Sequence, residues 1–194
     1  MSRVALVTGA SRGIGRAIAQ ALADAGYAVV VNFASRQGDA GVTTAAIAAA
    51  GGTAIAVQAD VSDPDAVARM FAAVDARFGR LDVLVNNAGI AQRFDRLTDI
   101  DDETWRRTLA VNLDGAFFCT RAAVPRLKAA GGGRIVNVSS GAAHTGGAIG
   151  AHYAASKAGM LALTAKAARE LARDGIAVNA VLPSVIETDM LDAI

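Results

Sequence analysis

Short apolar segments alternate with longer helical segments along the chain. The apolar segments are rich in valine, isoleucine and alanine and end at glycine or polar residues, as expected of buried parallel strands. They cover Val4–Val7, Ala28–Asn32, Ala54–Gln58, Val83–Asn86, Arg134–Val138 and Ile176–Val181. The helical patterns cover about Arg16–Asp24, Ala40–Ala50, Pro64–Phe78, Asp102–Ala129 and His152–Arg173. This alternation predicts an α/β fold: a doubly wound parallel sheet of strand order 3-2-1-4-5-6 with helices on both faces.

The composition excludes several classes of protein. The 194 residues suffice for a single domain with a sizeable core. A net charge of +1 without a basic run gives no sign of nucleic-acid binding. Although 53% of the residues are hydrophobic, no apolar run approaches the ~20 residues that span a bilayer, and no signal peptide precedes the first strand. We therefore expect a cytoplasmic protein that does not enter a membrane.

The cysteine and histidine content argues against a metal site. The single cysteine, Cys119, excludes an internal disulfide and a cysteine-based zinc site. No partner that would stabilise its thiolate is evident, so we expect a buried and inert thiol. His144 and His152 share no ligand spacing with a carboxylate or a cysteine. We expect both to face solvent or to lie behind the site, and we expect no metal.

A glycine-rich turn follows the first strand. It reads Thr-Gly-Ala-Ser-Arg-Gly-Ile-Gly, from Thr8 to Gly15, and a helix follows at once. The free N–H groups and the dipole at a helix start favour an anion, and glycine lets a pyrophosphate approach them closely. Such a turn also serves as a plain strand–helix connection. Its position after the first strand and before a helix favours dinucleotide binding.

Polar residues also follow the later strands directly. In a doubly wound sheet the ligand lies beyond the carboxyl ends of the strands, so these residues are expected to line one cleft. The groups are Asp60-Val61, Asn87–Gly89, Ser139-Ser140 and Pro183–Thr188.

Tyr153 and Lys157 lie four residues apart, on one face of the last helix. That face continues through Met160, Leu161 and Thr164, and a charge on such an apolar stripe is unfavourable unless it has a purpose. A lysine at a helix end also commonly extends along apolar surface to reach water. As a functional pair, the Lys157 cation lowers the pKa of Tyr153 from about 10, so that Tyr153 can transfer a proton near neutral pH.

Asn112 is a second polar residue on a core-like helix face. It shares that face with Trp105, Thr108, Leu109 and Ala116. An amide at such a position either satisfies a local backbone group or serves a site, and the residues alone leave both possibilities open.

Together these residues resemble the classical short-chain dehydrogenase/reductase family. The matching motifs are the Thr8–Gly15 turn, Asn86-Asn-Ala-Gly89, Ser140 and Tyr153-x-x-x-Lys157, in this order, with Asn112 in Val-Asn-Leu-Asp-Gly. The resemblance covers essentially the whole chain. Within the family, Tyr153-Ala-Ala-Ser-Lys-Ala-Gly and Ile186-Glu-Thr-Asp-Met190 are similar to the 3-oxoacyl-[acyl-carrier-protein] reductases.

The resemblance implies a role for each catalytic position. Tyr153 is the general acid in ketone reduction and the base in the reverse reaction, and Ser140 polarises the carbonyl. Lys157 lowers the pKa of Tyr153 and binds the nicotinamide ribose, while Asn112 holds a water that links Lys157 to solvent. Asp60 reaches the adenine. The residues implied to contact the dinucleotide are Gly9, Ser11, Arg12, Gly13, Ile14, Gly15, Ser35, Arg36, Asp60, Val61, Asn87, Ala88, Gly89, Tyr153, Lys157, Ile186 and Thr188.

The chain departs from the family pattern in two places. Pro183-Ser184 stands where the family has Pro-Gly after the sixth strand. The sequence ends at Ile194, whereas the family continues with a lid over the substrate and a seventh strand. We therefore expect residues 1–194 to form one dinucleotide-binding domain without that lid, and the natural protein to be longer.

The end of the second strand favours NADPH. NAD preference needs a carboxylate there to accept hydrogen bonds from the ribose diol, but the stretch reads Asn32-Phe-Ala-Ser-Arg36 and the first acid is Asp39. Arg12 and Arg36 can reach a 2′-phosphate with the Ser35 hydroxyl between them, and arginine can bond two phosphate oxygens at once. Arg36 is equally compatible with a solvated surface position.

The resulting expectation is the NADPH-dependent reduction of a ketone to a secondary alcohol, on a 3-oxoacyl thioester or another small carbonyl compound. A sugar or polyol dehydrogenase of the same family is the alternative, and a non-catalytic dinucleotide-binding protein a third possibility. The long helices carry more apolar residues than one sheet face needs, among them Phe117, Phe118, Leu161 and Leu163. We therefore expect a homo-oligomer, by family resemblance a tetramer.

Overall fold

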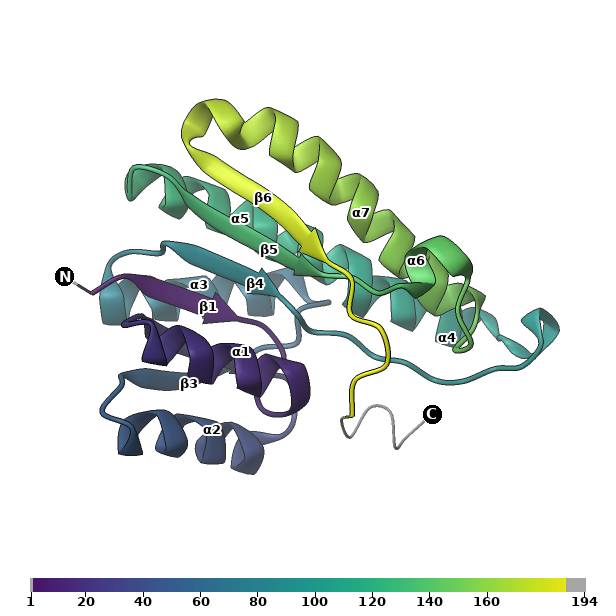
Figure 1. Cartoon of the computed structure of the whole chain (residues 1–194), viewed down its shortest axis with the longest axis horizontal. Helices are drawn as coiled ribbons and strands as arrows, with labels where there is room; N and C mark the ends of the chain where they lie inside the picture. Colours follow the sequence, from purple (N-terminus) through teal and green to yellow (C-terminus); the bar gives the residue numbers. More distant parts are fainter. Residues whose placement is uncertain (1, 188–194) are drawn as a thin grey trace.

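The computed structural model describes residues 2–187 and contains one parallel sheet in the order β3-β2-β1-β4-β5-β6. All five pairings between neighbouring strands are parallel (Figure 1). The strands are β1 Val4–Val7, β2 Ala28–Phe33, β3 Ala54–Gln58, β4 Val83–Asn86, β5 Gly133–Val138 and β6 Ile176–Val181. The predicted fold class and strand order are therefore confirmed, and the order reverses between β1 and β4, where a ligand cleft is expected.

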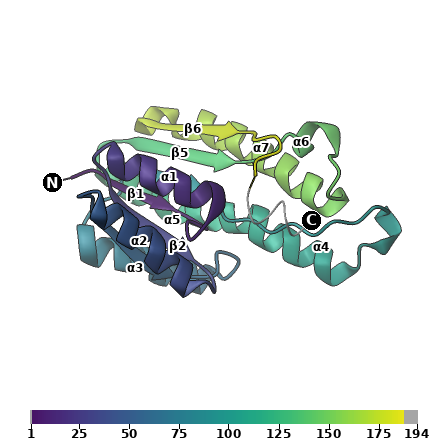
Figure 2. The ribbon, with the colours of Figure 1, turned by 60° about the horizontal axis from the view of Figure 1, so that its bottom comes forward.

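Helices cover the sheet on both faces. The main helices are α1 Gly13–Asp24, α2 Gln37–Ala49, α3 Pro64–Phe78, α4 Asp102–Leu109, α5 Gly115–Ala129 and α7 Ala151–Leu171. One core cluster joins α1 and α2 to the strands through residues such as Ala19 and Ile47. The other joins α3, α5 and α7 to the opposite face through Phe71, Leu127 and Leu171. Turning the molecule brings α1 and α2 to the near side of the sheet (Figure 2).

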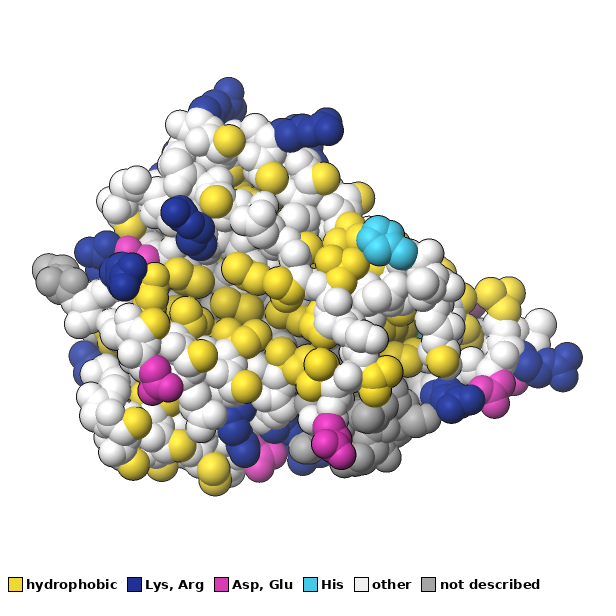
Figure 3. Space-filling model, in the orientation of Figure 1, with side chains coloured by type: hydrophobic (Ala, Val, Ile, Leu, Met, Phe, Trp, Pro, Cys, Tyr) yellow, Lys and Arg dark blue, Asp and Glu magenta, His cyan; other side chains and the backbone are white. Residues whose placement is uncertain are grey.

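The burial of the strands follows this cover. Every residue of β1, β2 and β4 is buried, because these strands have helices on both faces. Along β6, by contrast, Ile176 and Val178 are buried against α7 while Asn179 and Val181 are exposed. Within the described residues, no helix therefore covers the face of β6 that lies on the same side of the sheet as α1. In the space-filling view from the same direction as Figure 1, hydrophobic side chains gather in the middle of the surface (Figure 3).

Several boundaries differ from the prediction. Helix α1 begins at Gly13 and not at Arg16, because the glycine turn itself forms the first helical turn. Helix α2 begins at Gln37, earlier than expected. The loop after β5 contains a short helix, α6 Ala142–Thr145. This helix was not predicted, because the small residues of the loop show no helical pattern.

The predicted helix Asp102–Ala129 is interrupted. Between α4 and α5 the chain makes a π-helical turn over Ala110–Asp114, denoted η2, and Asn112 lies in its middle. A π turn widens the helix by one residue and often occurs at functional sites. Gly115 follows, where a Cβ atom would come within 2.7 Å of Val61 Cγ2. The interrupted helix therefore packs closely on the residues that follow β3.

Candidate functional site

The carboxyl ends of the strands open into a cleft of about 660 Å³. All but one of the described residues predicted to contact a dinucleotide or to act in catalysis line it, from the glycine turn through Asn87–Gly89 to Ser140, Tyr153 and Lys157. Asn112 is the exception, because it is fully buried behind the cleft wall. Thr188 lies outside the described residues, so its predicted contact stays a prediction.

The glycine turn is built for close approach. Gly9 and Gly13 have φ values of +62° and +53°, which residues with side chains rarely adopt. A Cβ atom at Gly15 would lie 2.3 Å from the Gly9 carbonyl oxygen and 2.5 Å from Asn87 Nδ2. The turn therefore leaves the N–H groups at the start of α1 bare on the cleft side, which fits the pyrophosphate of a dinucleotide.

Two buried polar side chains, Thr8 and Asn32, fix this turn in place. The Thr8 hydroxyl accepts hydrogen bonds from the backbone N–H groups of Asn87 and Ala88, each at 3.0 Å. Asn32 accepts from Gly9 N at 3.2 Å and donates to the Ala59 carbonyl at 3.0 Å. The sequence predicted this role for neither residue: Thr8 appeared only as the first residue of the glycine-rich motif, and Asn32 only as the end of a strand.

Ser140 and Tyr153 lie together at the other end of the cleft. Burial raises the pKa of Tyr153, and a side-chain hydrogen bond with Ser140 acts in the opposite direction. The Ser140 oxygen also accepts a hydrogen bond from Ala142 N at 3.2 Å. With that lone pair occupied by a donor, the Ser140 proton is free to point toward Tyr153 or toward a carbonyl in the cleft.

Lys157 is almost completely buried, with 4% of its surface exposed. Its Nζ atom donates to the Val138 carbonyl at 2.8 Å and lies 5.7 Å from the centre of the Tyr153 ring. Burial lowers the pKa of Lys157 to about 8. The net direction of the Tyr153 pKa is upward, because the tyrosine is itself buried. The predicted lowering of this pKa by Lys157 stays a prediction.

The Asn112 side chain is fully engaged. Its Oδ1 atom accepts from Ile90 N at 2.8 Å, and Nδ2 donates to the Ile90 carbonyl and to Ser156 Oγ. A Cβ atom at Gly89 would lie 3.3 Å from Asn112 Oδ1 and 3.5 Å from Lys157 Nζ. Asn112 thus holds the chain beyond β4 close to the lysine. The side chain supports the wall of the site, and its predicted water-holding role stays a prediction.

The corner predicted to hold a 2′-phosphate contains Arg12, Ser35 and Arg36, which all line the cleft. Arg36 also forms an exposed ion pair with Asp39, with 3.5 Å between the charged atoms. The sequence had placed Asp39 beyond the turn. Because α2 begins at Gln37, Asp39 falls in its first turn and lies next to Arg36.

Asp60 has a partner that the sequence did not reveal. Arg107 of α4 donates to Asp60 Oδ2 at 2.8 Å and to Ser62 Oγ at 2.6 Å, and it lines the same cleft. Burial raises the pKa of Asp60, but the hydrogen bonds from Ser62 and Arg107 outweigh it and hold the pKa below its usual value. Asp60 and Arg107 lie far apart in sequence, so no local pattern could have paired them.

Cys119, His144 and His152 do not line the cleft. Burial raises the pKa of the Cys119 thiol to about 12, in keeping with an inert cysteine. His144 is exposed, whereas His152 is buried and meets the Phe94 ring edge-on at 5.5 Å. Within residues 2–187, the structure brings together no group of three or more metal-ligating side chains.

Lys157→Met tests the burial of this cation. The folded protein releases the Lys157 proton near pH 8, whereas the unfolded chain keeps it until about pH 10.5. Between these values the unfolded state binds more protons, so the stability of the wild type rises with pH. We expect its free energy of unfolding to rise relative to the variant by on the order of 1–3 kcal/mol across this range, in urea denaturation.

The exposed lysine of the same helix, Lys166, provides the control. Lys166→Met is expected to change nothing in the pH dependence over the same range. A constant difference between the wild type and Lys157→Met would contradict the lowered pKa.

The chain is similar to known proteins over nearly its whole length. The pattern of the family described as short chain dehydrogenase matches residues 3–194. The chain is 46% identical to the 3-oxoacyl-[acyl-carrier-protein] reductase FabG of Staphylococcus aureus, over the whole chain and 78% of that enzyme. It is 47% identical to L-rhamnose 1-dehydrogenase (NAD(P)(+)) of Azotobacter vinelandii, over 98% of this chain and 75% of that enzyme.

A solved structure of similar sequence has the same fold as this chain. A short chain dehydrogenase from Burkholderia cenocepacia in complex with NADP superimposes with a TM-score of 0.91 at 42% identity, covering 97% of this chain and 76% of that one. No helix among the described residues is long and apolar enough to cross a membrane. From the family pattern, the relatives and the shared fold, the chain belongs to the short-chain dehydrogenase/reductase family of oxidoreductases and resembles its 3-oxoacyl-[acyl-carrier-protein] reductases.

Proposed function

We propose that this chain reduces the ketone of a 3-oxoacyl thioester to a secondary alcohol, with NADPH as the reductant. The observation that carries the proposal is one cleft with two chemically distinct ends. A bare helix start for phosphates lies at one end, and Ser140, Tyr153 and Lys157 lie at the other. A protein that only bound a dinucleotide would not need a proton donor beside a buried lysine.

The side chains at the second end have separate tasks. Ser140 donates a hydrogen bond to the substrate carbonyl and stabilises the negative charge that develops on its oxygen. Tyr153 gives its proton to that oxygen, which completes the alcohol. The Lys157 ammonium, held next to the tyrosine ring, compensates the charge left on Tyr153. The reduced nicotinamide, when bound, supplies the hydride to the carbonyl carbon.

The walls near Ser140 favour an acyl chain over a sugar. They are mostly small or apolar and include Ala142, Ala148, Ile149 and Val185. A sugar carries a hydroxyl on nearly every carbon, and a site that recognises one places polar partners around it. An acyl thioester needs polar contacts only at its carbonyl groups. The lining therefore supports a 3-oxoacyl substrate.

A sugar dehydrogenase is the second candidate. The similarity to L-rhamnose 1-dehydrogenase is as high as that to the acyl-carrier-protein reductase, so overall identity does not separate the two. The catalytic end of the cleft would serve either substrate.

A panel of substrates tests the proposal. With NADPH, we expect acetoacetyl thioester to be reduced with a kcat/KM at least ~10-fold above that of simple ketones, and we expect no oxidation of aldoses to match it in the reverse direction with NADP. A preference for an aldose would establish the second candidate instead.

The Tyr153→Phe variant tests the chemistry independently of the substrate. We expect kcat to fall by ~10²–10⁴-fold while NADPH still binds, as followed by its fluorescence. Near-normal turnover would show that another group supplies the proton.

Arg12→Ala tests the choice of cofactor. NADPH is expected to exceed NADH by at least ~10-fold in kcat/KM, because a charged hydrogen bond to the 2′-phosphate stabilises only NADPH. Most of this preference should disappear in Arg12→Ala. Arg36→Ala is expected to lose less, since the Asp39 carboxylate that lies beside Arg36 would repel a phosphate at that position. Equal use of both cofactors by the wild type would contradict the proposed phosphate site.

The outer surface of α4 and α5 supports a homo-oligomer, which we propose to be a tetramer. Trp105 and Phe117 are 39% and 43% exposed on these helices, whereas Phe118, Leu161 and Leu163 are half-buried. Sedimentation at micromolar concentration is expected to show an assembly that Phe117→Glu weakens. A monomer in the wild type would refute this proposal.

A further inference from the structure

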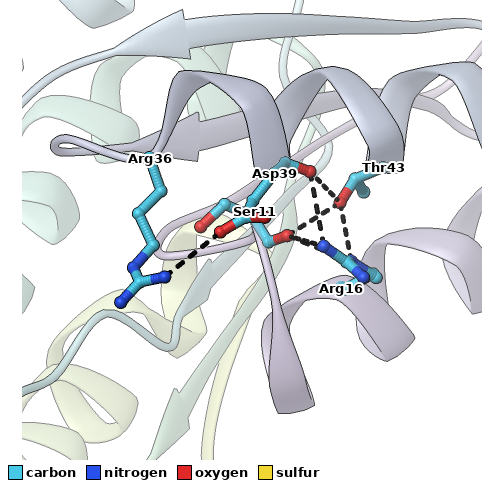
Figure 4. Close-up of polar contacts among 5 residues, drawn as sticks. All are labelled: Ser11, Arg16, Arg36, Asp39 and Thr43. Atoms are coloured by element: carbon cyan, nitrogen blue, oxygen red, sulfur yellow. Dashed lines mark hydrogen bonds and ion pairs between the residues drawn. The ribbon is translucent and has the colours of Figure 1, made fainter. Parts of the chain in front are cut away.

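Arg16 lies in the first turn of α1 and reaches sideways to α2 (Figure 4). Its Nε atom donates to the Ser11 carbonyl and to Thr43 Oγ1, each at 3.0 Å. A terminal nitrogen donates to the same Ser11 carbonyl at 2.6 Å and to the Asp39 carbonyl at 3.4 Å. One guanidinium thus joins the glycine turn to the beginning of α2.

These contacts fix one peptide group of the turn. The Ser11 carbonyl accepts from Arg16 and also from the buried Thr43 hydroxyl at 3.1 Å, so it is held against α2. In a trans peptide the next N–H points the opposite way. The Ser11–Arg12 peptide therefore has its carbonyl directed to α2 and its N–H directed away from α2, and both residues line the cleft.

The positive charge of Arg16 lies at the end of α1 where the helix dipole disfavours a cation. A cation in the first turn opposes the helix dipole, and α1 has no acidic residue there to offset it. Within residues 2–187, Arg16 contacts only neutral oxygen atoms, because the nearby Asp39 carboxylate pairs with Arg36. A bound anion at the start of α1 would remove this disadvantage.

Arg16 also connects the two sides of the corner that holds the proposed 2′-phosphate. Arg12 comes from the glycine turn, while Ser35 and Arg36 immediately precede α2. Arg16 and Thr43 bridge these two segments: Arg16 donates to the Ser11 and Asp39 carbonyls, and the single Thr43 hydroxyl proton lies within hydrogen-bond distance of the same two carbonyls. The spacing between the phosphate ligands thus depends on a side chain that lines no part of the cleft.

We propose that Arg16 is a positioning residue for NADPH: it holds the Ser11–Arg12 peptide and the start of α2 in the arrangement that binds the 2′-phosphate. This inference rests on the proposed function, since it assumes that NADPH is the cofactor. Arg16 takes no part in proton transfer. Its removal should weaken cofactor binding and leave the chemical step intact.

The test compares Arg16→Met with the wild-type chain. Methionine keeps much of the aliphatic stem and removes every donor. We expect the KM and the fluorescence Kd for NADPH to rise about tenfold, with kcat at saturating NADPH within about twofold of wild type and the kinetics with NADH less affected. Arg16→Lys, which keeps the charge but not the planar fork, should recover only part of the affinity. Arg169→Met, on an exposed position of α7, is the matched control.

Thr43 supplies an independent pair of variants should Arg16→Met fail to fold. Thr43→Val removes the hydroxyl at nearly constant volume and is expected to raise the NADPH Kd severalfold, whereas Thr43→Ser keeps the hydroxyl and the affinity. Wild-type NADPH affinity in folded Arg16→Met, or in Thr43→Val where Arg16→Met does not fold, would overturn the inference and leave the proposed function standing. A wild-type chain that binds no NADPH would overturn both.

Discussion

The structure depends on how closely two backbone segments approach each other where the strand order reverses. The turn after β1 and the chain after β4 meet there, joined by the Thr8 hydroxyl and by Asn87. Gly15 has no room for even one carbon atom, since a Cβ would lie 2.3 Å from the Gly9 carbonyl. This contact sets the position of α1 and with it the anion-binding end of the cleft. It also brings Gly89 beside Asn112 and Lys157, so the two ends of the cleft are placed by one piece of packing.

Lys157 is buried although burial disfavours its charged form, so its position lowers the stability of the fold. The burial that lowers the pKa of Lys157 to about 8 removes its charge from water, which costs free energy. A methionine at this position carries no charge and would not have this cost. The Val138 carbonyl, which accepts a hydrogen bond from Lys157 Nζ, partly offsets this, and the Ser139 hydroxyl helps to position Lys157 by donating to its carbonyl at 2.9 Å. The same burial makes Tyr153 a weaker acid in the absence of other charges. Under the proposed function, the Lys157 cation would oppose this effect of burial, because it stabilises the tyrosinate relative to the neutral tyrosine.

The features that could be predicted from the sequence are those that depend on local patterns of residues. Runs of apolar residues gave the six strands, and the glycine spacing gave the turn, because both depend on neighbours in the chain. The π-helical turn around Asn112 was missed, since one extra residue in a turn leaves no trace in an apolar stripe. The upward shift of the Tyr153 pKa by burial was not predicted, because burial is a property of the folded molecule. Arg16 did carry a local signal, a cation in the first turn of a helix, whereas the Arg107–Asp60 contact carried none.

The two ends of the cleft are subject to different constraints, and this explains why close relatives act on different compounds. At the phosphate end the pyrophosphate would bind to backbone groups, so any sequence that keeps the glycine turn and its supports would keep this part of the binding mode. At the other end, in the proposed function, Ser140, Tyr153 and Lys157 would act on a carbonyl whatever is attached to it. The rest of the substrate would meet other side chains of the cleft lining, such as Ile90 after β4, Ile149 between α6 and α7, and Val185 after β6. A few substitutions there change the substrate while the fold and the chemistry stay the same, as expected where function lies in the site and not in the fold.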